Sequence, residues 1–277
     1  MIRVKTEVPL SYITIKTTKS RIDKGLLAIP VSLIDLFPKS SSKIYIINDQ
    51  GTEEAKNFTS YNSSSGECRI GGLKAFYQQY QVKDGNEIVI IKADEGRYKI
   101  IPEDIFKSKM LGSMIKIENA ENEEQIEIEL KSICSLAVTN KKDLLLNEFV
   151  RLAGLKIEDR RIKSPKSSSS KEQVPPILRK ILLNLYEGKC QLTQFTFLMR
   201  NQNPYFEIHH INPLLGNHVK NLLVVCPNIH AQFTFSNVEH FYDEENWLRK
   251  VAFNHQEFGV FQKIDAMPKF FEKEIHS

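Results

Sequence analysis

The feature that most constrains this chain is the string EIHHINPLLGNHVKNLLVVCPNIH, which ends at His230. It contains the adjacent histidines His209 and His210, then Asn221, and it places Pro227 shortly before its end. Neighbouring side chains of a β-strand point to opposite faces, so the two adjacent histidines can take different roles. Proline is favoured at the first position of a helix, so a helix is expected to begin near Pro227. The string therefore predicts a strand that carries the histidine pair and a helix that carries His230.

These residue types suit the hydrolysis of a phosphodiester bond. A water must lose a proton as it attacks phosphorus, and a histidine is suited to take that proton near neutral pH. A divalent cation can stabilise the phosphate and the departing oxygen together, and imidazoles from two separate elements can hold it. An asparagine amide both donates and accepts hydrogen bonds, so it can fix a loop that aims the base. The pattern indicates a metal-dependent phosphodiesterase site.

The arrangement resembles the HNH nuclease family, over roughly residues 178–240. The family fold, called ββα-metal, is a β-hairpin followed by a helix with one metal between them. The resemblance implies that His209 and His230 bind the metal, that His210 is the general base and that Asn221 fixes the loop that orients it. It also implies a catalytic Mg²⁺ or another divalent cation, and products with a 5′ phosphate. The remaining histidines fit no such pattern and are expected to be ordinary surface residues: His218, His240, His255 and His276.

One departure from the family concerns structural zinc. Many HNH proteins carry two CxxC pairs around this core, and the corresponding positions here are Cys190 with Thr193 and Cys226 with Ile229. Structural zinc takes four protein ligands, and isoleucine cannot supply one, so we expect no structural zinc. We expect instead that Cys190 and Cys226 are buried close together and that the aromatic residues near the C-terminus replace the metal with hydrophobic packing.

A serine-rich, charged stretch, SPKSSSSKEQ at residues 164–173, divides the chain and has the composition of a linker. It predicts an α+β protein with a β-rich recognition domain over residues 1–107 and a nuclease domain over residues 175–277. A connecting segment is expected over residues 108–163, followed by the linker at residues 164–174.

The recognition domain is expected to be rich in strands. Alternating apolar residues predict strands at residues 10–16, 43–49 and 87–93. The stretch LKAFYQQYQ at residues 73–81 has apolar side chains three and four apart, which is typical of a helix. The Asp84-Gly85 pair predicts the turn that leads into the third strand.

Four further elements are expected beyond this domain. The alternation of IEIEL at residues 126–130 predicts an edge strand, and LLLNEFVRLAGL at residues 144–155 predicts a helix. The stretch PPILRKILLNLYEG at residues 175–188 predicts a helix that begins with prolines and ends at glycine. KCQLTQFTFL at residues 189–198 is a candidate for an extended hairpin.

The order of elements in residues 10–100, above all GLKAFYQQYQVKDGNEIVII, resembles the pseudobarrel DNA-binding domain of plant auxin-response factors and of EcoRII-like restriction enzymes. In that fold two arms grip the major groove of DNA. The resemblance places the first arm at residues 16–24 and the second at residues 56–69. The side chains that it implies for DNA contact are Lys19, Arg21, Lys24, Asn57, Thr59, Ser60, Tyr61, Asn62 and Arg69. The alternative is that both segments are solvated loops.

Together the two resemblances predict a type II restriction endonuclease that cuts double-stranded DNA. A modification-dependent nuclease is an alternative, and Tyr61, Phe76 and Tyr77 could supply its aromatic pocket. A DNA-binding regulator with an inactive nuclease fold is a second alternative, and a homing nuclease is a third. Cutting both strands with one site per chain predicts a homodimer, for which residues 108–163 are a candidate contact.

Composition agrees with an ordinary globular chain. Charged residues make up 26% of the chain and the formal net charge is +4, which by itself does not demand a nucleic-acid partner. We find neither a long apolar run nor a secretory signal, and the four cysteines are not closely paired. The expectation is a cytoplasmic protein with free thiols and no membrane span.

Overall fold

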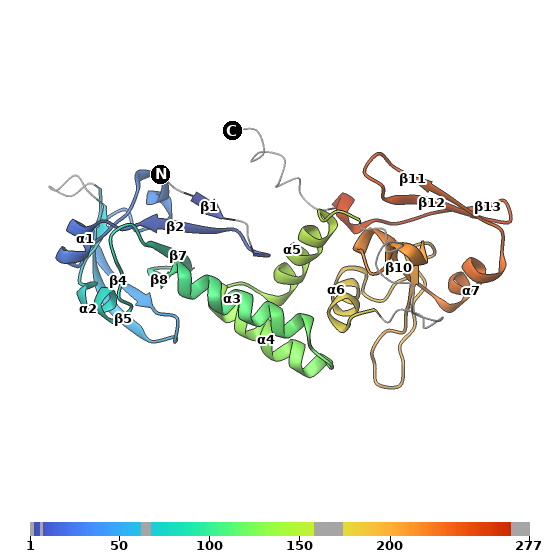
Figure 1. Ribbon diagram of the computed structural model, residues 1–277, viewed down its shortest axis with the longest axis horizontal. Coiled ribbons are helices and arrows are strands. Elements are labelled where there is room, and N and C mark those ends of the chain that lie inside the picture. The colour runs from blue at the N-terminus through green and yellow to red at the C-terminus, as the bar shows by residue number, and fades with distance from the viewer. Residues whose placement is uncertain (1–2, 6–7, 62–67, 158–173, 267–277) are drawn as a thin grey trace. The chain divides into compact units, whose positions relative to one another are not determined.

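The computed structural model describes residues 3–5, 8–61, 68–157 and 174–266, and Figure 1 shows its helices and strands. The chain divides into two compact units, residues 1–144 and residues 145–277. The expected linker lies outside the described residues except for Val174. The division falls inside helix α5 (Lys141–Ala153), so most of the connecting segment belongs to the first unit.

The first unit is built on one eight-stranded sheet. Its strands are β1 (Arg3–Lys5), β2 (Tyr12–Lys16), β3 (Leu27–Ala28), β4 (Ser42–Ile47), β5 (Glu53–Thr59), β6 (Arg69–Ile70), β7 (Glu87–Asp94) and β8 (Arg97–Pro102). Their order across the sheet is β1-β2-β7-β8-β4-β5-β6-β3. Strands β4 and β8 pair in parallel, and the other pairs among the described strands are antiparallel. The three strands expected from alternation are confirmed as β2, β4 and β7.

The sheet is strongly curled around a single hydrophobic core. Ile15 of β2 and Leu27 of β3 lie near opposite ends of the strand order, yet both belong to the same buried cluster. Ile44, Ile88 and Ile100, from strands between those ends, are fully buried there. A flat sheet cannot bring its two ends onto one core, so the strands form a nearly closed, barrel-like sheet. The expectation of a β-rich barrel is confirmed at this level.

Short helices close the barrel, and two longer ones follow it. They are α1 (Lys19–Lys24), η1 (Val31–Leu36), α2 (Lys74–Gln79), α3 (Glu103–Glu118) and α4 (Glu123–Ala137). Helix α2 confirms the expected helix at residues 73–81, and it buries Phe76 and Tyr77 in the core. Helix α3 packs on the sheet, where the rings of Tyr12 and Phe106 lie 4.9 Å apart.

The edge strand expected at residues 126–130 is wrong, because these residues lie within α4. Over the whole helix the buried residues Ile126, Leu130 and Ile133 recur three and four positions apart, which is helical spacing. The side chain of Asn122 caps the first turn by accepting a hydrogen bond from the Gln125 amide at 3.0 Å. Ile128, which made the alternation look strand-like, is 60% exposed. A five-residue window was too short to separate the two periods.

Within its described residues, the second unit combines a β-hairpin, a three-stranded sheet, α-helices and short 3-10 helices. Its elements are α6 (Pro176–Tyr186), β9 (Glu207–His210), η3 (Pro213–Leu215), η4 (Val219–Asn221), β10 (Leu222–Val225), α7 (Pro227–Phe235), β11 (Val238–Tyr242), β12 (Leu248–Phe253), β13 (Gln256–Gly259) and η5 (Lys263–Ala266). Helices α5, α6 and α7 confirm the three helices expected in this region. The hairpin expected at residues 189–198 is wrong in its bounds, since residues 191–193 form a turn and Leu198 makes an isolated bridge to Pro204, beyond the expected range.

The core of the second unit lies between the β9–β10 hairpin and the three-stranded sheet. Cys190, Cys226 and Ile229 are buried together with Leu248 and Phe253 of β12. The aromatic-rich C-terminal stretch thus forms β11, β12 and β13, which pack on the two cysteines. This confirms that the cysteines share one hydrophobic cluster. In the part of the chain that the structure describes, no helix is long and apolar enough to cross a membrane.

An ionic contact that is buried on the Asp49 side joins α3 to the barrel. The Asp49 carboxylate, at the turn after β4, accepts hydrogen bonds from Tyr80 and from Lys109 of α3. The Asp49 side chain is only 6% exposed. Burial by itself would raise the pKa of Asp49, but the hydrogen bonds from Lys109 and Tyr80 outweigh it and hold that pKa below its ordinary value of 3.8.

We expect Asp49→Asn to lower the free energy of unfolding by about 1–3 kcal/mol at pH 7, because both donors lose a charged acceptor. A folded-state pKa below the unfolded value stabilises the protein above that value, and the stabilisation is lost as pH falls. The difference between wild type and variant should therefore shrink as pH falls below 3.8. Urea unfolding at several pH values measures it, with the exposed Asp35→Asn as control. An unchanged difference between pH 7 and pH 3 would contradict the role of the charge.

Candidate active site

The β9–β10 hairpin presents the two adjacent histidines to different surroundings. In its antiparallel register His209 lies opposite Leu223 and His210 lies opposite Leu222. Both leucines are buried, which fixes the hairpin against the core. Because side chains alternate along β9, His209 and His210 point to opposite faces. The sequence-based expectation of a divided pair agrees with this strand assignment.

His209 faces helix α7. Its ring stacks on Phe233 with centroids 3.9 Å apart, and its centroid lies 5.3 Å from that of His230. Burial, together with the neighbouring imidazoles of His230 and His210, lowers the pKa of His209 to about 3. The ring is therefore neutral near pH 7 and keeps a lone pair. The ring of Phe233 also lies nearly parallel to that of His240, with centroids 6.1 Å apart, so this histidine is part of the site's support rather than an ordinary surface residue.

Glu207 orients His230. One of its carboxylate oxygens bonds Nδ1 of His230, and the other accepts a hydrogen bond from the Tyr205 hydroxyl at 2.8 Å. A bond at Nδ1 leaves Nε2 of His230 as the ring nitrogen available to a ligand. The sequence motif included Glu207 only as a residue that precedes the histidine pair, without a role of its own. The missed signal was its position two residues before His209, which places both side chains on one face of β9.

His210 contacts the loop that follows its own strand. Its Nε2 atom lies 2.9 Å from Oδ1 of Asn217. An amide oxygen can only accept, so Nε2 carries the proton and Nδ1 keeps the lone pair. With Nε2 as the donor to Asn217, Nδ1 is the ring nitrogen that this contact does not use.

Asn221 locks the loop at residues 211–217. Its Oδ1 accepts a hydrogen bond from the amide of Asn212 at 2.8 Å. Its Nδ2 donates to the carbonyl oxygens of Asn212 and Gly216, each at 2.8 Å. The side chain is 2% exposed, so these bonds are shielded from water. Since this loop carries Asn217, Asn221 holds the partner of His210 in place.

The four positions that the sequence-based resemblance assigns to zinc ligands come together in space. Cys190, Cys226 and Ile229 lie in one cluster, and the Thr193 hydroxyl is 3.9 Å from Sγ of Cys226. Burial alone would raise the pKa of Cys190, but bonds from the Thr193 hydroxyl and from backbone groups outweigh it and lower that pKa. Hydrophobic and polar contacts thus hold these four residues together.

His209 and His230 are the residues of this site that can hold a divalent ion. Their rings come from a strand and a helix, lie side by side, and the lone pair at Nε2 of His230 is free of the Glu207 bond. Among the residues described, no group of three or more His, Cys, Asp or Glu side chains is arranged to hold a metal. An ion bound by these two imidazoles would need water and substrate oxygens at its other positions.

The first expected DNA-binding arm is in part the helix α1. Lys19 and Lys24 are exposed, whereas Arg21 is half-buried. The amide of Lys19 donates to Oδ1 of Asp84 at 2.9 Å. The helix ends at Gly25, whose φ of +65° is left-handed, and a Cβ there would lie 2.9 Å from the backbone nitrogen of Lys74. The start of α2 thus fixes this end of α1.

The second arm is formed by the end of β5 and by β6. Asn57 and Tyr61 are exposed, and Thr59 lies half-buried opposite Arg69 in the strand register. Ser60 differs from the expectation of an exposed contact. It is 5% exposed and its amide donates to Oγ of Ser41 at 3.0 Å, so it supports the barrel. Asn62, the remaining residue of this arm, lies outside the described residues.

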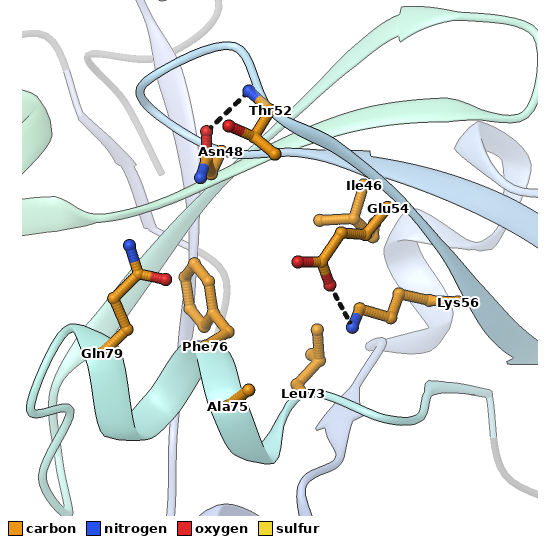
Figure 2. Close-up of a pocket in the computed structure, with 9 residues that line it drawn as sticks. All are labelled: Ile46, Asn48, Thr52, Glu54, Lys56, Leu73, Ala75, Phe76 and Gln79. Carbon is orange, nitrogen blue, oxygen red and sulfur yellow. Dashed lines mark hydrogen bonds and ion pairs between the residues drawn. The ribbon is translucent and has the colours of Figure 1, made fainter.

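The aromatic pocket suggested for a modified base does not form from the residues named for it. Phe76 and Tyr77 lie in the core, while Tyr61 is 47% exposed. Beside α2 lies a shallow groove with an empty volume of about 370 Å³. Figure 2 shows the ion pair between Glu54 and Lys56, 2.6 Å long, on its wall. Phe76 is the one aromatic residue among those that line it, so the groove offers no pair of rings to enclose a base.

No protein-family model matches this chain, and no curated protein matches it. Similar solved structures include an Arabidopsis FUS3–DNA complex, with 14% identity and a TM-score of 0.28, covering 32% of this chain and 92% of that one. They also include a hypothetical protein of Arabidopsis thaliana, with 14% identity and a TM-score of 0.27, covering 32% of this chain and 85% of that one.

Replacing Asn221 with alanine should lower the free energy of unfolding of the second unit by about 2–4 kcal/mol, because it leaves three buried backbone groups without partners. Amide hydrogen exchange of residues 211–217 should speed up in the same variant. Exposed Asn203→Ala is the matched control and should change neither quantity. Unaltered exchange in this loop would show that Asn221 does not hold it.

Proposed function

We propose that this chain is a metal-dependent endonuclease of the HNH type that acts on double-stranded DNA. The observation that carries the proposal is the divided histidine pair: His209 stands beside His230, while His210 on the opposite face is bonded to a loop that Asn221 locks. This arrangement separates a ligand pair from a basic nitrogen within one strand. Hydrolysis of a phosphodiester needs both parts at once.

The residues have distinct roles in this mechanism. His210, with Nε2 bonded to Asn217, takes a proton from the attacking water at Nδ1. His209 and His230 would hold a divalent ion, which when bound stabilises the charge on the phosphate and the departing 3′ oxygen. Glu207 fixes the ring of His230, and stacking on Phe233 fixes the ring of His209. The product would carry a 5′ phosphate.

Mg²⁺ is the ion that we propose for catalysis. Two imidazoles also suit softer divalent ions such as Zn²⁺, Ni²⁺ or Mn²⁺, because nitrogen ligands bind these ions better than they bind Mg²⁺. The neutral state of His209 supports either choice, since a protonated ring cannot bind a cation. No structural zinc enters the proposal, because Thr193 and Ile229 stand at two of the four ligand positions.

The first unit is proposed as the part that reads the DNA sequence, which makes the protein a type II restriction endonuclease of the cytoplasm. Phosphate contacts position a protein on DNA but do not specify a sequence, so a nuclease site needs a separate reader. The barrel-like sheet with α1 and the end of β5 at its surface supports this role. A homodimer is proposed because cutting both strands takes two sites.

The deciding experiment is digestion of plasmid and phage DNA with Mg²⁺, Mn²⁺, Ni²⁺ or Zn²⁺, followed by sequencing of the ends. His210→Ala should lower the cleavage rate by at least about 100-fold, because general-base catalysis contributes about 10²–10⁴-fold. DNA binding in EDTA should stay the same. His255→Asn, at an exposed histidine, is the control and should cut normally. An inactive wild type that still binds DNA would favour the regulator, and cleavage only of modified DNA would favour the modification-dependent nuclease.

Arg21→Ala and Arg69→Ala should each weaken binding to the preferred sequence by about 1–3 kcal/mol if these side chains contact bases. Binding to unrelated DNA should weaken less. The exposed Lys39→Ala provides a control for the loss of one positive charge. Competition titrations with specific and unrelated duplexes measure both affinities. An equal loss of affinity for the two duplexes would show that these residues contact phosphates and not bases.

A further inference from the structure

A short hairpin projects from the second unit directly before β9. We call residues 195–205 the finger. The amide of Tyr205 donates to the carbonyl of Phe197 at 2.9 Å, and the amide of Met199 donates to the carbonyl of Asn203 at 2.8 Å. Gln202, at the turn, has a left-handed φ of 65°. These backbone bonds make the finger an ordered hairpin, which appears in yellow-orange in Figure 1.

The finger exposes apolar side chains that folding of the second unit does not use. Phe195 is 53% exposed, Phe197 43% and Leu198 59%. Three exposed apolar side chains that are close in one hairpin form a local patch, and exposed apolar patches are candidates for contact surfaces. At the tip stand the exposed polar residues Arg200, Asn201 and Gln202. The finger thus combines an apolar ridge with a polar, singly charged tip.

Contacts link the finger to the proposed active site. The rings of Phe197 and Tyr205 are stacked with centroids 5.2 Å apart, and the Tyr205 hydroxyl bonds Glu207, which in turn bonds His230. At its base the amide of Cys190 donates to the carbonyl of Phe195 at 2.9 Å. A duplex whose phosphate reaches His230 would therefore meet the finger on the same body.

We propose that the finger enters the minor groove of the DNA that the site cuts, with Leu198 as a wedge between base pairs and Arg200 against the groove. Proteins that bind the minor groove use Arg, Asn and Gln to read it, and they insert Phe, Leu, Met or Pro between base steps. The finger carries both sets within one hairpin: Phe197, Leu198, Met199, Arg200, Asn201, Gln202 and Pro204. This inference rests on the proposed function, because it takes duplex DNA as the substrate.

The test uses the full chain in EDTA, so that no DNA is cut, and an alternating dA-dT polymer in which about one adenine in ten is 2-aminopurine. Unstacking of a base step raises the fluorescence of 2-aminopurine. Wild type should raise it on binding, and netropsin, which fills the minor groove, should compete. Leu198→Ser should abolish the rise and weaken binding about five- to tenfold, and Arg200→Ala should weaken binding by a similar factor. Ile128→Ser, at a helix residue that is 60% exposed, is the matched control and should behave like wild type.

Several outcomes would contradict the proposed role of the finger. These are wild-type binding without a fluorescence rise, Leu198→Ser and Arg200→Ala variants that act like wild type, and the absence of any DNA binding. A Leu198→Ser variant that changes the oligomeric state in sedimentation but not DNA binding would make the finger a contact between copies. The proposed function can fail separately. If the wild type binds DNA with the fluorescence rise and the expected variant effects, yet cuts no DNA with any divalent ion, the role of the finger is supported and the nuclease activity is contradicted.

Discussion

The hydrogen bonds of the Asn221 side chain are the constraint on which the candidate site depends. They close the loop between β9 and β10 from inside, where water cannot replace them. That loop carries Asn217, which fixes the ring of His210, and its closure sets the register that places His209 toward α7. Through this loop, the Asn221 side chain therefore supports the hairpin that carries both His209 and His210. Its place at the end of η4, directly before the buried strand β10, explains why it is shielded.

Around this hairpin each ring has its own support. His230 is held through Glu207 and Tyr205, and His209 through Phe233, whose ring also lies nearly parallel to that of His240. These supports come from three elements that also build the core, so the site and the core share their framework. The first unit follows a different principle, since its curled sheet is closed by aliphatic side chains and tied to α3 through Asp49. Each unit thus keeps its polar contacts at the edge of an apolar core.

Local patterns in the sequence predicted elements well where one period dominated. The alternation around β2, β4 and β7 and the position of Pro227 gave the strands and the start of α7. IEIEL failed because five residues satisfy either period, and only the long α4 resolves it. His240 was missed as a site residue because its role depends on Phe233 of α7. Glu207 was missed because its contact with His230 joins β9 to α7, although its spacing from His209 was visible in the sequence. The burial of Ser60 was missed for a similar reason, since it bonds Ser41, which directly precedes β4 and is distant in the sequence.

The cluster around Cys190 and Cys226 has a consequence for how the second unit responds to its surroundings. Where four thiolates hold a zinc ion, the supply of metal decides whether the domain folds at all. Here Ile229, Leu248 and Phe253 fill the space around the two thiols, so the fold is held by apolar contact. The stability of the second unit at this cluster then depends on how well these side chains fit together, so a substitution that opens a gap there would act on the whole unit.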